Sequence, residues 1–244
     1  MVRKKFSDYR QSHQGRGDDY DITFRDLPHR ALIWEFERRY LDRILDLYPS
    51  PKSISYLDFA CGTGRVIRYL ENKVGRSVGV DVANSMLECA RARCSRSILQ
   101  CVDITKERYA INEHFDLITA FRFFPNAEPP LRAEAIRALT DLLKPDGRLV
   151  FNNHLNSRSL MMRMMCLFRK PFGDEGVANT EMEQMIRRAG LRIENIFHVG
   201  VAPAVDQINY FPTGLLRLIE ECCARLAFLS EFAQDVIFVC KHAV

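Results

Sequence analysis

Carboxylates and glycines suited to binding a nucleotide-like ligand are concentrated between residues 54 and 104. Asp58 lies near the end of a short apolar run, Gly62 and Gly64 follow it, and Asp81 closes the next apolar run. Glycine lets the backbone pass close beneath a ligand because it has no Cβ, and a carboxylate accepts hydrogen bonds from vicinal hydroxyl groups. These residue types at this spacing predict a site for a ligand that contains a sugar diol.

The elements that must position these residues are a strand, a tight loop and a helix. Residues 54–59 are short, apolar and β-prone, and the apolar residues after Arg65 follow helical spacing. A helix that begins at the loop points its N-terminal N–H groups at the ligand. A nicotinamide-binding fold usually has a third glycine three residues after Gly64, where this chain has Ile67. The spacing therefore argues against a nicotinamide cofactor.

The ordered series Asp58-Phe59-Ala60-Cys61-Gly62-Thr63-Gly64, Val80-Asp81 and Val102-Asp103-Ile104 resembles the motif set of class I S-adenosylmethionine-dependent methyltransferases. The resemblance runs over about residues 53–154 and continues weakly over 190–241. The family more often has glycine where this chain has Ala60. The resemblance implies S-adenosyl-L-methionine as methyl donor, S-adenosyl-L-homocysteine as product, and no metal.

Within that resemblance, each acidic position has an expected role and an alternative. Asp81 would accept the ribose hydroxyls or cap a helix, and Asp58 would lie near the methionyl amino group. Asp103 would accept the adenine amine or serve as a turn aspartate, and Met86 would cover the adenine or belong to the core. The predicted cofactor residues are Asp58, Ala60, Cys61, Gly62, Gly64, Asp81, Val82, Met86, Asp103, Ile104 and Phe121.

The residues after the fourth predicted strand are where this family borders the transferred methyl group. The segment 121–126 lacks the Asp or Asn followed by Pro-Pro and an aromatic residue that adenine and some amide methyltransferases use. This absence argues against a base or amide acceptor and favours a hydroxyl oxygen. Arg122 would hold a carboxylate or phosphate of the substrate, or pair at the surface.

His154 follows the fifth predicted strand, at the edge where open α/β sheets bind ligands. We hypothesise that it is the general base, since an imidazole accepts a proton at neutral pH; substrate hydrogen bonding and capping are the alternatives. Tyr20 lies in an N-terminal arm that would close over the cofactor or serve as a linker. The predicted substrate residues are Tyr20, Arg122, Asn126, Asn153 and His154.

Predicted strands and helices alternate along the chain, which indicates an α/β fold. Alternation favours a parallel sheet because parallel strands need helical crossovers. We expect a Rossmann-like, seven-stranded, mostly parallel sheet with an antiparallel last strand, helices on both faces, an N-terminal helical arm over 28–48 and lid insertions. Pro145-Asp146-Gly147 is expected to form a turn before the fifth strand. The predicted strands are 54–59, 77–80, 98–102, 115–120, 148–152, 191–199 and 235–241.

Composition is ordinary for a globular domain. The chain has 244 residues, with 47% hydrophobic and 27% charged residues, which is enough for one large core. We predict a flexible basic tail over 1–27 and a single methyltransferase domain over 28–244. Insertions are expected at about 155–178 and 204–234.

The distribution of charge along the chain limits the kinds of partner that we expect. The formal net charge of +4 comes from residues 1–17, which hold five Lys or Arg and one Asp and leave 30 charges of each sign elsewhere. A neutral body argues against a nucleic-acid footprint. The eight cysteines show neither CxxC pairs nor zinc-ligand spacing, and no apolar run is long enough for a membrane span. We therefore expect a cytoplasmic protein that binds no metal.

The expected function is methylation of a small molecule, most simply at a hydroxyl oxygen. The Met-rich, cationic segment 158–172 would act as a lid or rest on an anionic membrane. One alternative is therefore a methyltransferase of a glycan or lipid-linked sugar near a membrane. An alternative of another class is a non-catalytic S-adenosylmethionine-binding regulatory protein.

Overall fold

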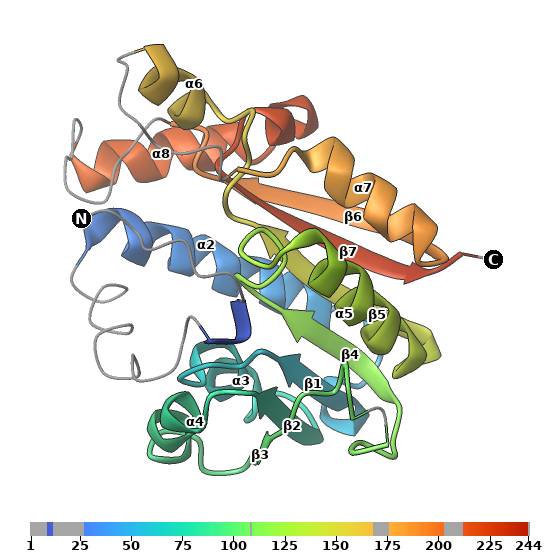
Figure 1. The fold of residues 1–244 in the computed structure, drawn as a ribbon. Helices are drawn as coiled ribbons and strands as arrows, with labels where there is room; N and C mark the ends of the chain where they lie inside the picture. Colours follow the sequence, from blue (N-terminus) through green and yellow to red (C-terminus); the bar gives the residue numbers. More distant parts are fainter. Residues whose placement is uncertain (1–8, 12–26, 108, 168–175, 203–211, 244) are drawn as a thin grey trace.

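The computed structural model describes residues 9–11, 27–107, 109–167, 176–202 and 212–243, and Figure 1 shows its elements. The strands are β1 (Ser55–Phe59), β2 (Arg76–Asp81), β3 (Ile98–Cys101), β4 (Phe115–Ala120), β5 (Leu143–Asn153), β6 (Leu191–Val199) and β7 (Asp235–His242). The helices are α2 (Pro28–Leu45), α3 (Arg65–Leu70), α4 (Asn84–Arg91), α5 (Pro129–Asp141), α6 (Leu160–Leu167), α7 (Asn179–Arg188) and α8 (Thr213–Cys223). Three short 3-10 turns are η1 (Tyr9–Gln11), η2 (Pro51–Ser53) and η3 (Ala227–Glu231).

The described strands form one seven-stranded sheet in the order β3-β2-β1-β4-β5-β7-β6. β1 pairs in parallel with β2 and β4, and β7 runs antiparallel between β5 and β6. The predicted Rossmann-like sheet with an antiparallel last strand is confirmed. The strand order reverses between β1 and β4, and open α/β sheets bind ligands at the carboxyl ends of the strands at such a point.

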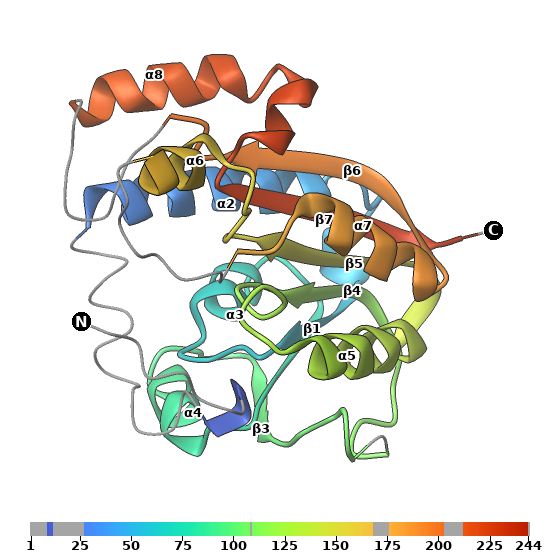
Figure 2. The same cartoon turned by 45° about the horizontal axis from the view of Figure 1, so that its top comes forward.

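Helices cover both faces of this sheet because successive side chains of each strand point to opposite faces. Leu57 packs into a core with α5 and α7, whereas its neighbour Tyr56 packs into a second core with α2 and α3. Figure 2 shows the two helical layers from above. The predicted helices on both faces are confirmed.

The start of β5 differs from the prediction. Phe115 pairs with Leu143 and Leu117 pairs with Arg148, so the Pro145-Asp146-Gly147 segment is an extended bulge inside β5. The prediction of a separate turn is wrong because pairing with β4 begins before the bulge rather than after it. Local turn propensity yields here to the pairing with the neighbouring strand.

The N-terminal helical arm is α2, and it packs tightly against α3. The guanidinium of Arg65 lies 4.2 Å from the centre of the Trp34 ring and donates to Glu37 Oε2 at 2.5 Å. Tyr69 donates to Asp42 Oδ2 at 2.7 Å. These contacts fix α2 against the helix that follows the glycine loop.

The two predicted insertions contain α6 and, in the second, α8 with η3. α8 lies beside α2 (Figures 1 and 2). Residues 168–175 and 203–211 are outside the described residues, so the lid role of both insertions stays a prediction, as does the division into a tail and one domain. Among the described helices, none combines the length and apolarity needed to cross a bilayer.

Candidate functional site

The loop after β1 has three residues with left-handed backbone, Ala60 (φ +54°), Gly62 (φ +55°) and Gly64 (φ +84°). A Cβ on Gly62 would meet no atom within 4 Å, whereas a Cβ on Gly64 would lie 3.0 Å from Cys94 Sγ. Gly62 therefore keeps space open above the loop, and Gly64 lets α3 approach α4. Ala60 adopts a conformation that favours glycine, which accounts for the glycine that the resembling family prefers there.

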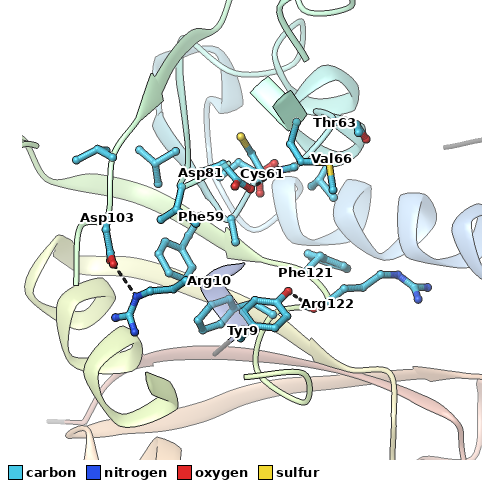
Figure 3. A pocket seen from close by; sticks show the side chains of 18 of the residues that line it. Tyr9, Arg10, Phe59, Cys61, Thr63, Val66, Asp81, Asp103, Phe121 and Arg122 are labelled. Carbon is cyan, nitrogen blue, oxygen red and sulfur yellow. Dashed lines mark hydrogen bonds and ion pairs between the residues drawn. The ribbon is translucent and has the colours of Figure 1, made fainter. Parts of the chain in front are cut away.

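A cavity lies over this loop at the carboxyl edge of the sheet (Figure 3). Most of the predicted cofactor residues come together in its wall, although they belong to the ends of four strands (β1, β2, β3 and β4) and to α4. The predicted residues that line it are Asp58, Ala60, Cys61, Gly62, Asp81, Val82, Met86, Asp103, Phe121 and Arg122.

Two predicted cofactor residues do not line this cavity. Gly64 faces α4, as described above, and Ile104 is 2% exposed within the hydrophobic core. The expectation that Ile104 packs on a ligand ring is not met because its side chain turns from the strand end into that core. Met86 does line the cavity, so its position fits the ligand-covering alternative.

Asp58 is buried at the floor of the cavity and is held by two hydrogen bonds. Its Oδ1 accepts from Thr119 Oγ1 at 2.6 Å and its Oδ2 accepts from the Ile67 N–H at 3.1 Å. The Tyr56 hydroxyl contacts Thr119 Oγ1 at 2.7 Å, so the chain of hydroxyls ends on Asp58. Burial raises the pKa of the Asp58 carboxyl to about 7 despite these bonds. Asp58 is therefore poised to ionise when a cation binds.

Asp81 links the glycine loop to the end of β2. Its Oδ2 accepts from the Gly62 N–H and its Oδ1 from the Ala83 N–H, both at 2.8 Å. Ala83, not Asp81, is the N-cap residue of α4, so the capping alternative is not observed. A carboxylate has about four acceptor sites, so orientation by two N–H groups is compatible with further bonds from a diol.

The N-terminal turn η1 contributes Tyr9 and Arg10 to the cavity wall. Figure 3 shows Arg10 directed at Asp103 and the Tyr9 hydroxyl directed at the backbone of Arg122. The sequence interpretation placed the closing arm at Tyr20, which lies outside the described residues. The contact residues of the arm that the structure does describe are therefore ten positions earlier.

The other end of the cavity is bordered by a buried cluster of charges around Arg122. Its guanidinium Nη2 lies 3.7 Å from Glu37 Oε1 and 4.0 Å from Asp235 Oδ2, and both acids are essentially unexposed. Its backbone has φ +60° and its N–H donates to Asn152 Oδ1 at 2.6 Å. Arg122 thus faces buried internal carboxylates rather than a surface partner.

The carboxylates of this cluster come from distant elements, α2 and β7. Asn152 Nδ2 donates to both oxygens of Asp235 at 3.0 Å. Burial, followed by the negative charge of Glu37, raises the pKa of Asp235 to about 7.

Three predicted substrate residues lie near this cluster but do not line the cavity. Asn126 Nδ2 donates to the Arg122 carbonyl at 2.6 Å and lies 3.4 Å from His154 Nε2. Asn153 Nδ2 donates to the Val177 carbonyl and to Asn179 Oδ1 at 2.8 and 2.9 Å. Asn153 therefore ties β5 to α7.

Sequence reasoning missed Tyr9, Arg10, Arg65, Glu37 and Asp235. The basic tail offered a weak signal for Arg10, and a single acid on the apolar face of the predicted helix 28–48 offered one for Glu37. Asp235 was assigned to the last strand without a role. Within the described residues, no group of three or more His, Cys, Asp or Glu side chains is arranged to hold a metal ion.

Comparison with known proteins agrees with this geometry. Residues 57–147 match the family described as a methyltransferase domain. The chain is 34% identical over 107 residues to the dTDP-3-amino-3,6-dideoxy-alpha-D-glucopyranose N,N-dimethyltransferase of Streptomyces fradiae, covering 44% of this chain and 35% of that protein. It is 25% identical over 169 residues to the ubiquinone biosynthesis O-methyltransferase of Neisseria meningitidis serogroup C, covering 63% and 68%. The chain thus spans about a third of the first relative's length.

Solved structures share the whole fold at low identity. The magnesium protoporphyrin IX methyltransferase of Synechocystis, solved with bound SAH, has a TM-score of 0.65 at 11% identity and covers 93% of this chain and 96% of that one. An S-adenosylmethionine-dependent methyltransferase of Clostridium acetobutylicum has a TM-score of 0.63 at 16% identity and covers 93% and 99%. At these identities the structural likeness shows the fold.

Proposed function

We propose that this chain, whose residues 57–147 match the methyltransferase-domain family, is a class I S-adenosylmethionine-dependent methyltransferase that methylates a hydroxyl oxygen of a small molecule. S-adenosyl-L-methionine supplies an electrophilic methyl group on a sulfonium, and S-adenosyl-L-homocysteine is the product. The observation that supports this proposal most directly is one cavity that joins the buried Asp58, the oriented Asp81 and the open space over Gly62.

The residues present fit this cofactor. Asp81 is oriented to accept the two ribose hydroxyls, and Asp58 lines the cavity at a position that suits a methionyl ammonium group. Asp103 lines the opposite end, where the adenine amine would donate to it. Methyl transfer is an in-line displacement, so the protein mainly holds donor and acceptor collinear and excludes water.

The acceptor side follows from the order of the strands. The acidic cofactor residues lie at the ends of β1, β2 and β3, which leaves the ends of β4 and β5 for the acceptor. Phe121 and Arg122 line the cavity there. His154 remains our proposed base on the strength of its position after β5: it lies behind the cavity wall, with its Nε2 3.4 Å from Asn126 Nδ2.

The direct test is calorimetry with S-adenosylmethionine and S-adenosylhomocysteine on the wild-type protein and the Asp81→Ala variant. Wild type should bind both, and Asp81→Ala should lose about tenfold or more in affinity because two charge-assisted hydrogen bonds are lost. Undiminished binding by the variant, or no binding by wild type, would refute the proposal.

Turnover is tested with methyl-labelled cofactor and cell extract, followed by separation of small polar, lipid and macromolecular fractions. Label in small polar compounds that survives mild acid and contains a methyl ether supports hydroxyl methylation. Tight cofactor binding without any labelled product would instead indicate a regulatory binding protein.

A second candidate keeps the chemistry and changes the acceptor to a sugar attached to a carrier. The 34% identical relative is named for a dTDP-linked amino sugar, and α8 with η3 exposes apolar side chains such as Leu218 and Phe228, at 58% and 68%. Label that enters nucleotide-linked or lipid-linked sugars would favour this candidate. A cytoplasmic location, peripheral membrane contact and the lack of a nucleic-acid partner stay predictions.

A further inference from the structure

Two residues of η1, Tyr9 and Arg10, contact cavity residues that lie 93 or more positions away in the sequence. Arg10 Nε donates to Asp103 Oδ2 at 2.7 Å, and Arg10 Nη2 donates to Thr105 Oγ1 at 2.8 Å and to Glu134 Oε2 at 3.2 Å. The guanidinium is thereby oriented by three acceptors on two different elements. Its side chain is 20% exposed, and that of Asp103 is 15% exposed.

Tyr9 holds the same turn at the end of the cavity that is opposite Asp103. Its N–H donates to Glu128 Oε2 at 3.3 Å, and its hydroxyl donates to the Arg122 carbonyl at 3.3 Å. Its ring packs edge-on against Phe123, with the ring centres 5.4 Å apart. The turn therefore spans the cavity from the Asp103 end to the Arg122 end, as Figure 3 shows.

Asp103 has capacity for Arg10 and a ligand together. Its Oδ1 accepts from the N–H and the hydroxyl of Thr105 at 3.1 and 2.6 Å, and its Oδ2 accepts from Arg10. A carboxylate oxygen accepts two hydrogen bonds, so Oδ2 has geometry for one more donor such as an aromatic amine. A planar guanidinium also stacks favourably on an aromatic base.

We propose that Arg10 is a cofactor-binding residue, and that its ion pair with Asp103 is a latch that closes the N-terminal turn over the adenine end of the bound cofactor. This inference rests on the proposed function, because it takes the cavity ligand to be S-adenosylmethionine. With the latch closed, Arg10 and Tyr9 form one wall of the cavity, so the cofactor product leaves only after the ion pair opens.

The latch predicts a defined kinetic effect. Replacing Arg10 by alanine removes the charge-assisted bonds to Asp103 and Thr105 together with the wall over the adenine. We expect the dissociation rate of S-adenosylhomocysteine to rise about tenfold and the affinity to fall by a similar factor, since hydrogen bonds to charged groups contribute at this scale. Arg10→Lys should lie between, because one ammonium does not reproduce the planar fork.

The experiment measures S-adenosylhomocysteine dissociation by stopped flow and affinity by calorimetry in wild type, Arg10→Ala, Arg10→Lys and Arg76→Ala. Arg76 is a matched control because it also pairs through two nitrogens, with Glu113 at 2.9 and 3.1 Å, but lies outside the cavity lining. Thermal melting confirms that each variant is folded. Arg10→Ala values equal to those of wild type would overturn the latch.

A second readout separates a latch from simple loss of packing. An ion pair weakens with salt, so product dissociation from wild type should accelerate between about 0.05 and about 0.5 M NaCl, while Arg10→Ala should respond little. Equal salt dependence in the two proteins would contradict the latch. Failure of wild type to bind either cofactor form would instead refute the proposed function, so the two failures are distinguishable.

Discussion

Asp58 gives the most quantitative prediction, because its side chain is buried against a cavity that is proposed to bind a cation. The residue is 2% exposed, and burial raises its pKa from 3.8 to about 7. Replacing it with asparagine keeps the shape and removes the titration. The substitution therefore isolates the free energy that is linked to one proton.

The sign and size of the effect follow from this pKa. Between pH 3.8 and about 7 the folded protein holds a proton on Asp58 that the unfolded chain has released. The unfolded state binds fewer protons in this window, so the free energy of unfolding falls as pH rises and the contribution is lost above pH 7. A raised pKa of about three units corresponds to about 4 kcal/mol across the whole window.

Urea unfolding between pH 5 and about 7 measures this slope. Asp58 and Asp235 should each contribute up to about 1.4 kcal/mol per pH unit in wild type. The Asp58→Asn variant should lose the Asp58 contribution to this slope, and Asp235→Asn should lose the Asp235 contribution. The double variant should lose both contributions. If Asp58→Asn retained the wild-type slope, the buried, neutral carboxyl described here would be refuted.

The affinity for the cofactor should depend on the protonation of the same Asp58 carboxyl. A methionyl ammonium favours the ionised carboxylate, of which only about a tenth is present one unit below the pKa. Affinity of wild type for S-adenosylmethionine should therefore rise about tenfold from pH 6 to about 8, whereas Asp58→Asn should bind weakly and with a flat profile. A variant with the wild-type pH profile would contradict the assignment.

Four further substitutions test the loop and the proposed base. Ala60→Gly should raise the free energy of unfolding by about 0.5 kcal/mol, because relief of left-handed strain exceeds the added chain entropy. Gly64→Ala should destabilise by about 2 kcal/mol, more than Gly62→Ala, since only the Gly64 Cβ meets Cys94; urea unfolding measures all three. His154→Gln should lower turnover at saturating acceptor at least tenfold, and an unchanged rate would eliminate His154 as the base.

The cofactor half of the site was predictable because its determinants are local. The run before Ala60 is apolar and β-prone, the two glycines mark the loop, and Asp81 and Asp103 follow strand ends that must align in a parallel sheet. Residues 115–120 were predicted as a strand with the observed bounds. Hydrophobic periodicity and turn residues act over a few positions, and they are sufficient to predict this strand and the glycine loop.

The features that the sequence did not predict depend on contacts between residues far apart in the chain. Arg10 meets Asp103 across 93 positions, and Arg122 meets Asn152 across 30. No local pattern encodes such pairs, because a charged residue in a tail or on a helix looks solvated until the fold places its partner. The bulge in β5 was missed for a related reason, since pairing with β4 overrides the turn preference of Pro145-Asp146-Gly147.

These two kinds of determinant also lie differently with respect to the matched family domain. The family match ends at residue 147, so it includes the glycine loop, Asp81 and Asp103 but excludes Glu37 and Asp235. The excluded acids come from α2 and β7 and lie beside Arg122, at the end of the cavity proposed for the acceptor. Under the proposed function, the matched domain contains the residues proposed to bind the methyl donor, whereas the acids around Arg122 lie outside it, as is possible in a fold that keeps one donor and changes the acceptor.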